Sequence, residues 1–181
     1  MNDLDAEANL LGALALVVND RTEEAIAATG LAPSAAAALS ALHQFLDHPS
    51  IDRLRQVLGL TPSGTVRLVD RLVEAGYVVR GPAQDKRTVS VALTPKGRRA
   101  AARVEAARAS VLNGALADLS AAERETLHDL LGKLIAPFVR ANLDRGPGGG
   151  WICRLCDLAA CGREAGQCPT ANTAAGYIGQ S

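Results

Sequence analysis

The sequence predicts a mainly α-helical protein with one small β-hairpin, and three features support this fold class. Hydrophobic residues make up 48% of the chain but aromatic residues only 3%, so alanine, leucine and valine must fill the core. Alanine-rich, aromatic-poor sequences favour helices. Most of the chain repeats apolar residues at helical spacing, whereas residues 77–79 and 89–93 are rich in β-formers and flank a polar, turn-prone loop.

Residues 60–97 contain the helix around which the rest of the prediction is organised. Thr61 can accept a hydrogen bond from the amides of the first turn, and Pro62 suits the first helical position because its missing N–H is not needed there. Gly76 readily takes the left-handed conformation that ends a helix. The residues between them recur at the spacing of one buried helix face: Thr65, Leu68, Val69 and Leu72.

A short helix over residues 51–57 comes before this one, and Ser50 is placed to cap it. Gly59 and Leu60 form the turn between the two helices, so the pair is predicted to be a helix-turn-helix. Residues 89–93 alternate between the two faces of a strand, so the polar loop before them joins two antiparallel strands. A helix-turn-helix followed by a hairpin has the outline of a winged helix-turn-helix.

The outer face of the longer helix suits DNA. With its apolar stripe buried, four residues project away from the core: Ser63, Val66, Arg67 and Arg71. A helix fits the major groove, where an arginine can bind guanine at two points and a valine methyl can contact thymine. At the hairpin tip, Lys86 and Arg87 suit phosphates or a narrow minor groove, and Asp85 is expected to orient Arg87 by pairing with it.

The charge distribution agrees with this prediction, although the net charge of the chain is zero. Residues 1–49 carry one arginine against seven acidic residues, a net charge of −6. Residues 50–100 carry ten basic residues against four acidic ones, a net charge of +6, and residues 101–181 carry eight of each. The positive excess therefore lies on the predicted DNA-reading segment, as expected of a protein that binds phosphates.

The wing carries a specific resemblance. DKRTVSVALTPKG after RLVDRLVEAGYVVR resembles the MarR family of bacterial transcriptional regulators, whose wing reads D-x-R, an apolar strand and then L-T-x-x-G. Those positions are here Asp85, Arg87, Leu93, Thr94 and Gly97. The resemblance covers residues 4–142 and implies a homodimeric winged helix-turn-helix protein, a repressor that binds a palindromic operator in double-stranded DNA. At residue 66 the family often has a hydroxyl side chain, so the valine here departs from the family pattern.

Amphipathic helices are predicted on both sides of the DNA-binding part. One runs over about residues 4–29, where the polar residues 20–24 are expected to kink or interrupt it. Thr94 and Pro95 begin a second helix after the hairpin. Ser120 and Glu123 form a capping box that opens a third. Together these helices offer more apolar face than one small domain can cover, so a second copy of the chain is the expected partner.

The predicted organisation has three parts. A winged helix-turn-helix domain at 1–145 is followed by a glycine-rich linker at 146–150 and a cysteine-rich tail at 151–181. Within the domain, residues 1–30 and 95–145 are the N- and C-terminal dimerisation helices, and residues 33–97 are the DNA-binding part. Residues 169–181 of the tail are expected to be disordered.

The four cysteines of the chain all lie in the tail, with the spacing C-x2-C-x4-C-x6-C: Cys153, Cys156, Cys161 and Cys168. A C-x2-C pair suits two thiolates on one metal ion, and Gly162 and Gly166 allow tight turns. Four thiolates satisfy tetrahedral zinc, so zinc is the expected cofactor. An iron–sulfur cluster, redox-switching thiols and a disordered tail with idle cysteines are the alternatives.

The predicted function is DNA-binding transcriptional regulation. The alternative is a metal- or redox-responsive sensor in which the cysteines, through zinc or an iron–sulfur cluster, control DNA binding. No catalytic triad, dinucleotide-binding or phosphate-loop motif indicates an enzyme. The family resemblance also allows a small-molecule effector, for which no residues are indicated. No stretch resembles a membrane span or signal peptide, so a cytoplasmic protein with no membrane partner is expected.

Overall fold

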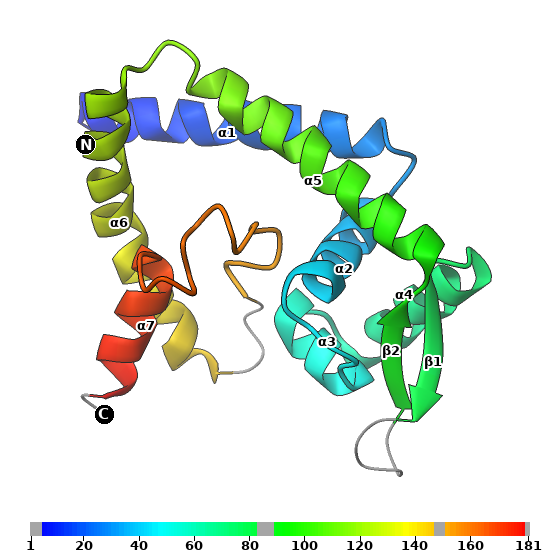
Figure 1. Cartoon of the computed structure of the whole chain (residues 1–181). Helices are drawn as coiled ribbons and strands as arrows, with labels where there is room; N and C mark the ends of the chain where they lie inside the picture. Colours follow the sequence, from blue (N-terminus) through cyan, green and yellow to red (C-terminus); the bar gives the residue numbers. More distant parts are fainter. Residues whose placement is uncertain (1–4, 83–88, 147–150, 180–181) are drawn as a thin grey trace.

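The computed structural model describes residues 5–82, 89–146 and 151–179 and confirms the mainly helical fold with one two-stranded antiparallel hairpin. Its elements are α1 (Ala6–Ala27), α2 (Pro33–Gln44), α3 (Ile51–Leu58), α4 (Pro62–Glu74), β1 (Val78–Pro82), β2 (Val89–Leu93), α5 (Pro95–Ala115), α6 (Ala121–Asp144) and α7 (Pro169–Ile178). None of the described helices is both long and apolar enough to cross a membrane. In Figure 1, α2, α3, α4 and the hairpin gather around the start of α5, and α1 runs along α5.

One apolar core joins these elements into the DNA-binding part. Its buried members include residues from α2, α3, α4, the hairpin and the first half of α5: Ala36, Leu39, Leu54, Val57, Leu68, Val69, Leu72, Val78, Val91, Ala100 and Val104. Small alanine side chains allow α2 and α5 to approach closely, as expected for a chain with so few aromatic residues. The core therefore fixes α4 by its buried stripe and leaves the opposite face of α4 in solvent.

The predicted helix starts are confirmed by their capping hydrogen bonds. The Gly64 N–H donates to Thr61 Oγ1 (3.1 Å) at the start of α4, and the Arg53 N–H donates to Ser50 Oγ (3.1 Å) at the start of α3. At α6 the capping box is complete, with Ser120 and Glu123 each accepting from the other's backbone N–H. These contacts span three residues, so each can be read from local sequence.

The hairpin is attached to the helix-turn-helix at its base. The Val91 N–H of β2 donates to the carbonyl of Pro49 (3.0 Å), and the Ser90 hydroxyl donates to the carbonyl of Gly81 (3.2 Å) in β1. The Thr94 N–H donates to the carbonyl of Tyr77 (3.0 Å). The base of the wing is therefore held to the entrance of α3 and to the end of α4.

Gly97 is required by a close approach between α5 and the hairpin. A Cβ atom at residue 97 would lie 2.0 Å from the carbonyl oxygen of Tyr77 and 3.0 Å from Leu93 Cδ2. No side chain other than hydrogen fits there, so the glycine of the L-T-x-x-G sequence is explained by backbone packing.

The expectation that residues 20–24 would kink or interrupt the first helix is wrong, because α1 is continuous. Its polar stretch faces solvent, where Arg21 and Glu24 pair at 3.3 Å. The Thr22 hydroxyl donates to the carbonyl of Val18 (2.7 Å), so the side chain adds a hydrogen bond instead of competing with the helix. A charged stretch on an exposed face is compatible with an unbroken helix.

The expectation that residues 169–181 would be disordered is also wrong, because α7 occupies most of this range. Pro169 starts α7 and packs on α6 at Gly132, where an added Cβ would lie 3.2 Å from Pro169 Cβ. Near the other end of α7, the Tyr177 hydroxyl donates to Asp144 Oδ1 (2.9 Å). Figure 1 shows α7 lying along α6.

Candidate nucleic-acid interface

Helix α4 presents two distinct faces. Thr65, Leu68 and Val69 are buried in the core, as the spacing predicted. The four residues predicted to read DNA all lie on the exposed side: Ser63, Val66, Arg67 and Arg71. Val66 keeps 43% of its surface exposed, although it is apolar. The structure thus places the four residues predicted to contact DNA on one solvent-facing surface of one helix.

Arg67 and Arg71 differ in their surroundings. The Arg71 Nε donates to the carbonyl of Arg67 (3.3 Å), so this guanidinium lies back along the helix. Within the described residues, the Arg67 side chain has no hydrogen-bond or ion-pair partner. Gly64 adds no side chain beside them, and together with Asp70 these residues line a shallow hollow on the surface. Arg67 is therefore the side chain most available to a ligand on this face.

An ion pair that sequence reasoning missed joins α4 to the wing. The Arg80 Nη2 of β1 lies 2.6 Å from Asp70 Oδ1 of α4, and both side chains are partly exposed. The pair holds Asp70, the one carboxylate among the described residues that line the hollow, against a cation and so reduces the repulsion between Asp70 and a phosphate. No local sequence pattern predicts this ion pair, because the two residues are ten apart in sequence and meet only when the hairpin folds back on the helix.

The predicted wing-tip residues Asp85, Lys86 and Arg87 lie outside the described residues, so their roles remain predictions. The strands that carry the tip are described down to Pro82 and from Val89, and they project away from the helical body (Figure 1).

Three other basic side chains in this region make contacts within the protein. The Lys96 Nζ donates to the carbonyl of Ala75 (2.8 Å) at the end of α4 and lies 4.9 Å from the Tyr77 ring centroid. Arg55 pairs with Asp52 at 2.7 Å. The Arg53 guanidinium of α3 lies over the indole ring of Trp151, 4.6 Å from its centroid.

The second candidate site is the cysteine-rich segment, residues 151–168, whose four cysteines are all free thiols. The thiols of Cys153 and Cys156 lie close enough to shift each other's pKa in opposite directions. Burial and then the nearby Cys168 raise the pKa of Cys161. Charge on Cys168 also contributes to the raised pKa of Cys153, and charge on Cys156 to that of Cys161, so the two pairs are near each other. In the described ranges, however, no group of three or more histidine, cysteine or acidic side chains is arranged to hold a metal ion as it stands.

The surroundings of the pair Cys153–Cys156 favour one thiolate. The hydrogen bond from Cys153 lowers the pKa of Cys156 to about 6, aided by the positive charges of Arg108, Arg163 and Arg154 and opposed by burial. The same hydrogen bond, together with burial, raises the pKa of Cys153. Cys153 and Cys168 are buried, although the segment around them has no regular secondary structure.

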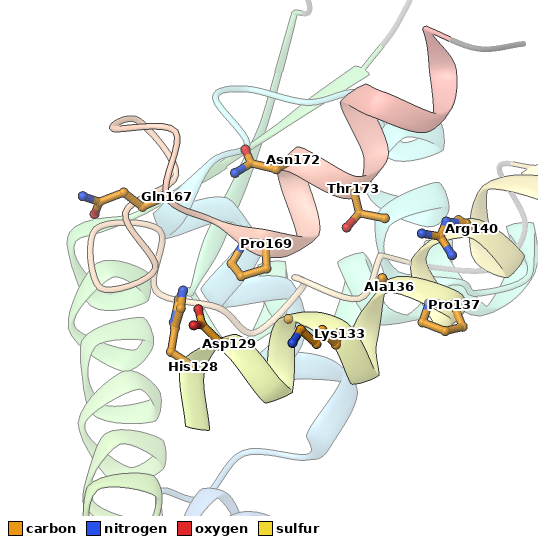
Figure 2. A pocket seen from close by; sticks show the side chains of 11 residues that line it. His128, Asp129, Lys133, Ala136, Pro137, Arg140, Gln167, Pro169, Asn172 and Thr173 are labelled. Carbon is orange, nitrogen blue, oxygen red and sulfur yellow. The ribbon is translucent and has the colours of Figure 1, made fainter. Parts of the chain in front are cut away.

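A polar hollow of about 580 Å³ lies along the seam between α6 and α7. Figure 2 shows His128, Lys133 and Arg140 of α6 on one side and Gln167, Asn172 and Thr173 on the other. The charged side chains here are exposed, and they do not form an arrangement of nucleophile, base and orienting group. The hollow therefore carries no indication of catalysis.

Comparison with known proteins identifies the family. A sequence model of the MarR family matches residues 29–88, which span α2, α3, α4 and β1. A probable transcriptional regulator from Pseudomonas aeruginosa has a crystal structure with a TM-score of 0.53 and 30% identity, and the match covers 68% of this chain and 96% of that chain. No curated protein sequence matches the chain.

Two further solved structures share the fold. CouR from Rhodococcus jostii RHA1, bound to p-coumaroyl-CoA, is 25% identical with a TM-score of 0.57 over 72% of this chain and 92% of that chain. Wild-type MarR from E. coli is 24% identical with a TM-score of 0.62 over 74% of this chain and 99% of that chain. With its wing sequence, its exposed reading helix and these neighbours, the chain belongs to the MarR family of transcriptional regulators and is not an enzyme.

Proposed function

We propose that the protein is a homodimeric repressor that binds a palindromic operator. The family and fold support a DNA-binding transcriptional regulator. The observation that carries the proposal is the exposed face of α4, where Arg67 lies unpaired among the described residues on a helix fixed by its buried side. A rigidly held helix with a free guanidinium is suited to reading a base edge in the major groove.

The dimer is supported by apolar surface that the single chain leaves exposed. On α1, Leu10, Leu14 and Leu16 keep 68%, 57% and 67% of their surface exposed. On α6, Leu134 and Phe138 keep 47% and 69% exposed. Exposed large apolar side chains in this number favour an interaction site, and a second copy offers a self-complementary one.

A two-fold dimer would place two α4 helices on one side of DNA, which is why the proposed operator is palindromic. The test begins with the full-length protein and sheared genomic DNA, from which bound fragments are selected, sequenced and footprinted. We expect a recurring inverted repeat protected at both halves, and reduced transcription in vitro from a promoter that contains it. Recovery of fragments without a common sequence would overturn the proposal.

The second candidate function is regulation through the cysteine-rich segment, with a metal ion or thiol oxidation as the input. The observation that favours it is the position of this segment against α3, the first helix of the helix-turn-helix: the Trp151 N–H donates to the carbonyl of Val57 (2.7 Å). A change in the cysteines could therefore reach the DNA-reading helices directly. DNA affinity measured before and after chelation, and before and after a mild thiol oxidant, tests this function.

A further inference from the structure

The cysteine-rich segment lies between two parts of the molecule. Figure 1 shows it crossing the space from α2 and α3 to α6 and α7. On the first side, the Trp151 indole stacks on the Phe45 ring with centroids 5.5 Å apart and an interplanar angle of 4°. The Arg53 guanidinium also lies over the indole, 4.6 Å from the ring centroid. Trp151 thus contacts both an α3 cation and the aromatic residue that ends α2.

A second anchor connects the middle of the segment to α2 and α5. The Leu158 N–H donates to Gln44 Oε1 (3.1 Å), and the Gln44 Nε2 donates to Glu105 Oε1 (2.9 Å). His43 Nδ1 also lies 2.9 Å from the same carboxylate oxygen. A backbone amide of the segment is therefore tied into a polar network between two helices of the DNA-binding part.

The other end of the segment continues into α7, which packs on α6. Among the described elements, α7 is the main contact that α6 makes within its own chain. The cysteine-rich segment, which leads into α7 through Cys168, is consequently a physical connection from α3 to α6 inside one chain. This connection spans the part that reads DNA and the helix proposed to dimerise.

The segment needs a cross-link to act as a rigid connection. Its described backbone consists of successive turns, such as the one closed by the Cys156 N–H and the carbonyl of Cys153 (2.9 Å). By themselves, eighteen residues without helix or strand bury too little apolar surface to hold one conformation between the anchors at Trp151 and Leu158 and the start of α7. A metal ion is the usual substitute for a core in segments of this size.

We infer that Cys153, Cys156, Cys161 and Cys168 bind one zinc ion, which fixes the cysteine-rich segment as a strut between α3 and α6. The two neighbouring thiol pairs supply the four ligands that zinc prefers. Among the described residues no three such side chains are yet arranged to hold a metal ion, so zinc binding would have to draw the two pairs together and displace the thiol protons. Four thiolates around Zn²⁺ carry a net charge of −2, which Arg108, Arg154 and Arg163 are placed to offset.

With four protein ligands the site has no open position, so its role is structural. Zinc binding has a second consequence that rests on the proposed DNA-binding function. By holding Trp151 against Phe45 and Arg53, the loaded segment fixes the helix-turn-helix relative to α6. The metal-free protein would sample other orientations of its reading helices and bind its operator more weakly.

The metal site is tested on full-length protein purified without chelators. Emission spectroscopy should find one zinc per chain, and the four thiols should react only after the zinc is removed under reducing conditions. Trp151 is the only tryptophan in the chain, so its fluorescence reports the strut without any DNA. We expect a red shift on zinc removal and recovery on zinc addition. Cobalt(II) in place of zinc should give the absorption bands of a tetrahedral thiolate site.

Two variants at one position separate ligation from thiol chemistry. Cys161→His keeps a zinc ligand and should retain zinc, whereas Cys161→Ser should lose it and show the red-shifted fluorescence. Zinc retained in Cys161→Ser would overturn the site. Iron with labile sulfide, disulfide bonds in the purified protein, or metal-free protein with four reactive thiols would overturn it as well.

The coupling to DNA has its own variant. Trp151→Ala should retain zinc, because the ligands remain, but its operator affinity should no longer depend on zinc. In the wild type, zinc removal should weaken operator binding about tenfold, the size of an ordinary coupling between sites. Equal zinc dependence in Trp151→Ala would overturn the strut. Failure of the zinc-loaded wild type to bind any operator would instead contradict the proposed function and leave the metal result standing.

Discussion

At the scale of single residues, Arg67 is the side chain on which base reading depends most. We predict that Arg67→Ala costs about 1–3 kcal/mol of operator binding, because a two-point contact with guanine is lost. Fluorescence anisotropy on the operator and on a scrambled duplex measures the effect, which should be much larger on the operator. Arg21→Ala on α1 is the matched control and should leave both affinities unchanged, because in the described part of the chain this arginine pairs with Glu24 alone. Equal losses on both duplexes would reduce Arg67 to a phosphate contact.

The wing tip leads to a second residue-scale prediction, based on sequence alone. Arg87→Ala should weaken binding to all DNA sequences and reduce the salt slope by about one, because one phosphate or minor-groove contact is removed. Asp85→Ala should also weaken binding if the carboxylate orients Arg87, although the substitution removes a negative charge. A titration of affinity against salt measures both. Tighter binding by Asp85→Ala would show that simple charge, and not orientation, governs the wing.

At this scale the sequence could not predict which arginines already contact other residues of the protein. Arg53 is a reasonable phosphate candidate on its own helix, but it stacks on Trp151, nearly a hundred positions away. The signal that could have found this contact is the single tryptophan of an aromatic-poor chain, since a lone indole usually has a packing partner. The pair Asp70–Arg80 likewise depends on the return of the hairpin, which no local pattern encodes.

At the scale of elements, the contact between α5 and the hairpin leads to a stability prediction. Gly97→Ala should destabilise the protein by about 1–3 kcal/mol or more, because the new methyl overlaps the Tyr77 carbonyl. Thermal unfolding followed by circular dichroism measures the change. Gly176→Ala in α7 is the control: its Cβ meets no atom within 4 Å, so the melting temperature should stay the same or rise. A Gly97→Ala variant as stable as the wild type would mean that α5 shifts freely on the wing.

Elements that begin with a local cap were predictable, and elements held by distant contacts were not. Four helices, α3, α4, α5 and α6, begin at a capping side chain that accepts a hydrogen bond from the backbone N–H three residues later. By contrast, α7 has no side-chain cap, and its sequence lacks a strong apolar stripe. It is positioned by Pro169 against Gly132 of α6, a contact between residues far apart in the sequence. For this reason the prediction that residues 169–181 are disordered was wrong.

At the scale of the whole molecule, the exposed apolar faces of α1 and α6 support the proposed dimer. The single chain covers one face of α6 with α7, and the other face keeps Leu130, Leu131, Leu134 and Phe138 at least 47% exposed. Dimerisation through this surface would join the two cysteine-rich segments, one per chain, and the two α4 helices in one assembly. The spacing between the two α4 helices would then depend on both the dimer interface and the struts.

We therefore predict that Phe138→Asp separates the dimer, because a charge placed in a desolvated apolar interface costs several kcal/mol. Light scattering should give a mass near 18.7 kDa instead of twice that value. The separated chains should bind the operator far more weakly, since each presents only one α4 and the second half-site no longer contributes. His128→Glu is the matched control: it also adds a carboxylate to exposed α6 surface, but beside α7, and should leave the dimer intact. A Phe138→Asp protein that stays dimeric and binds its operator normally would place the dimer interface elsewhere.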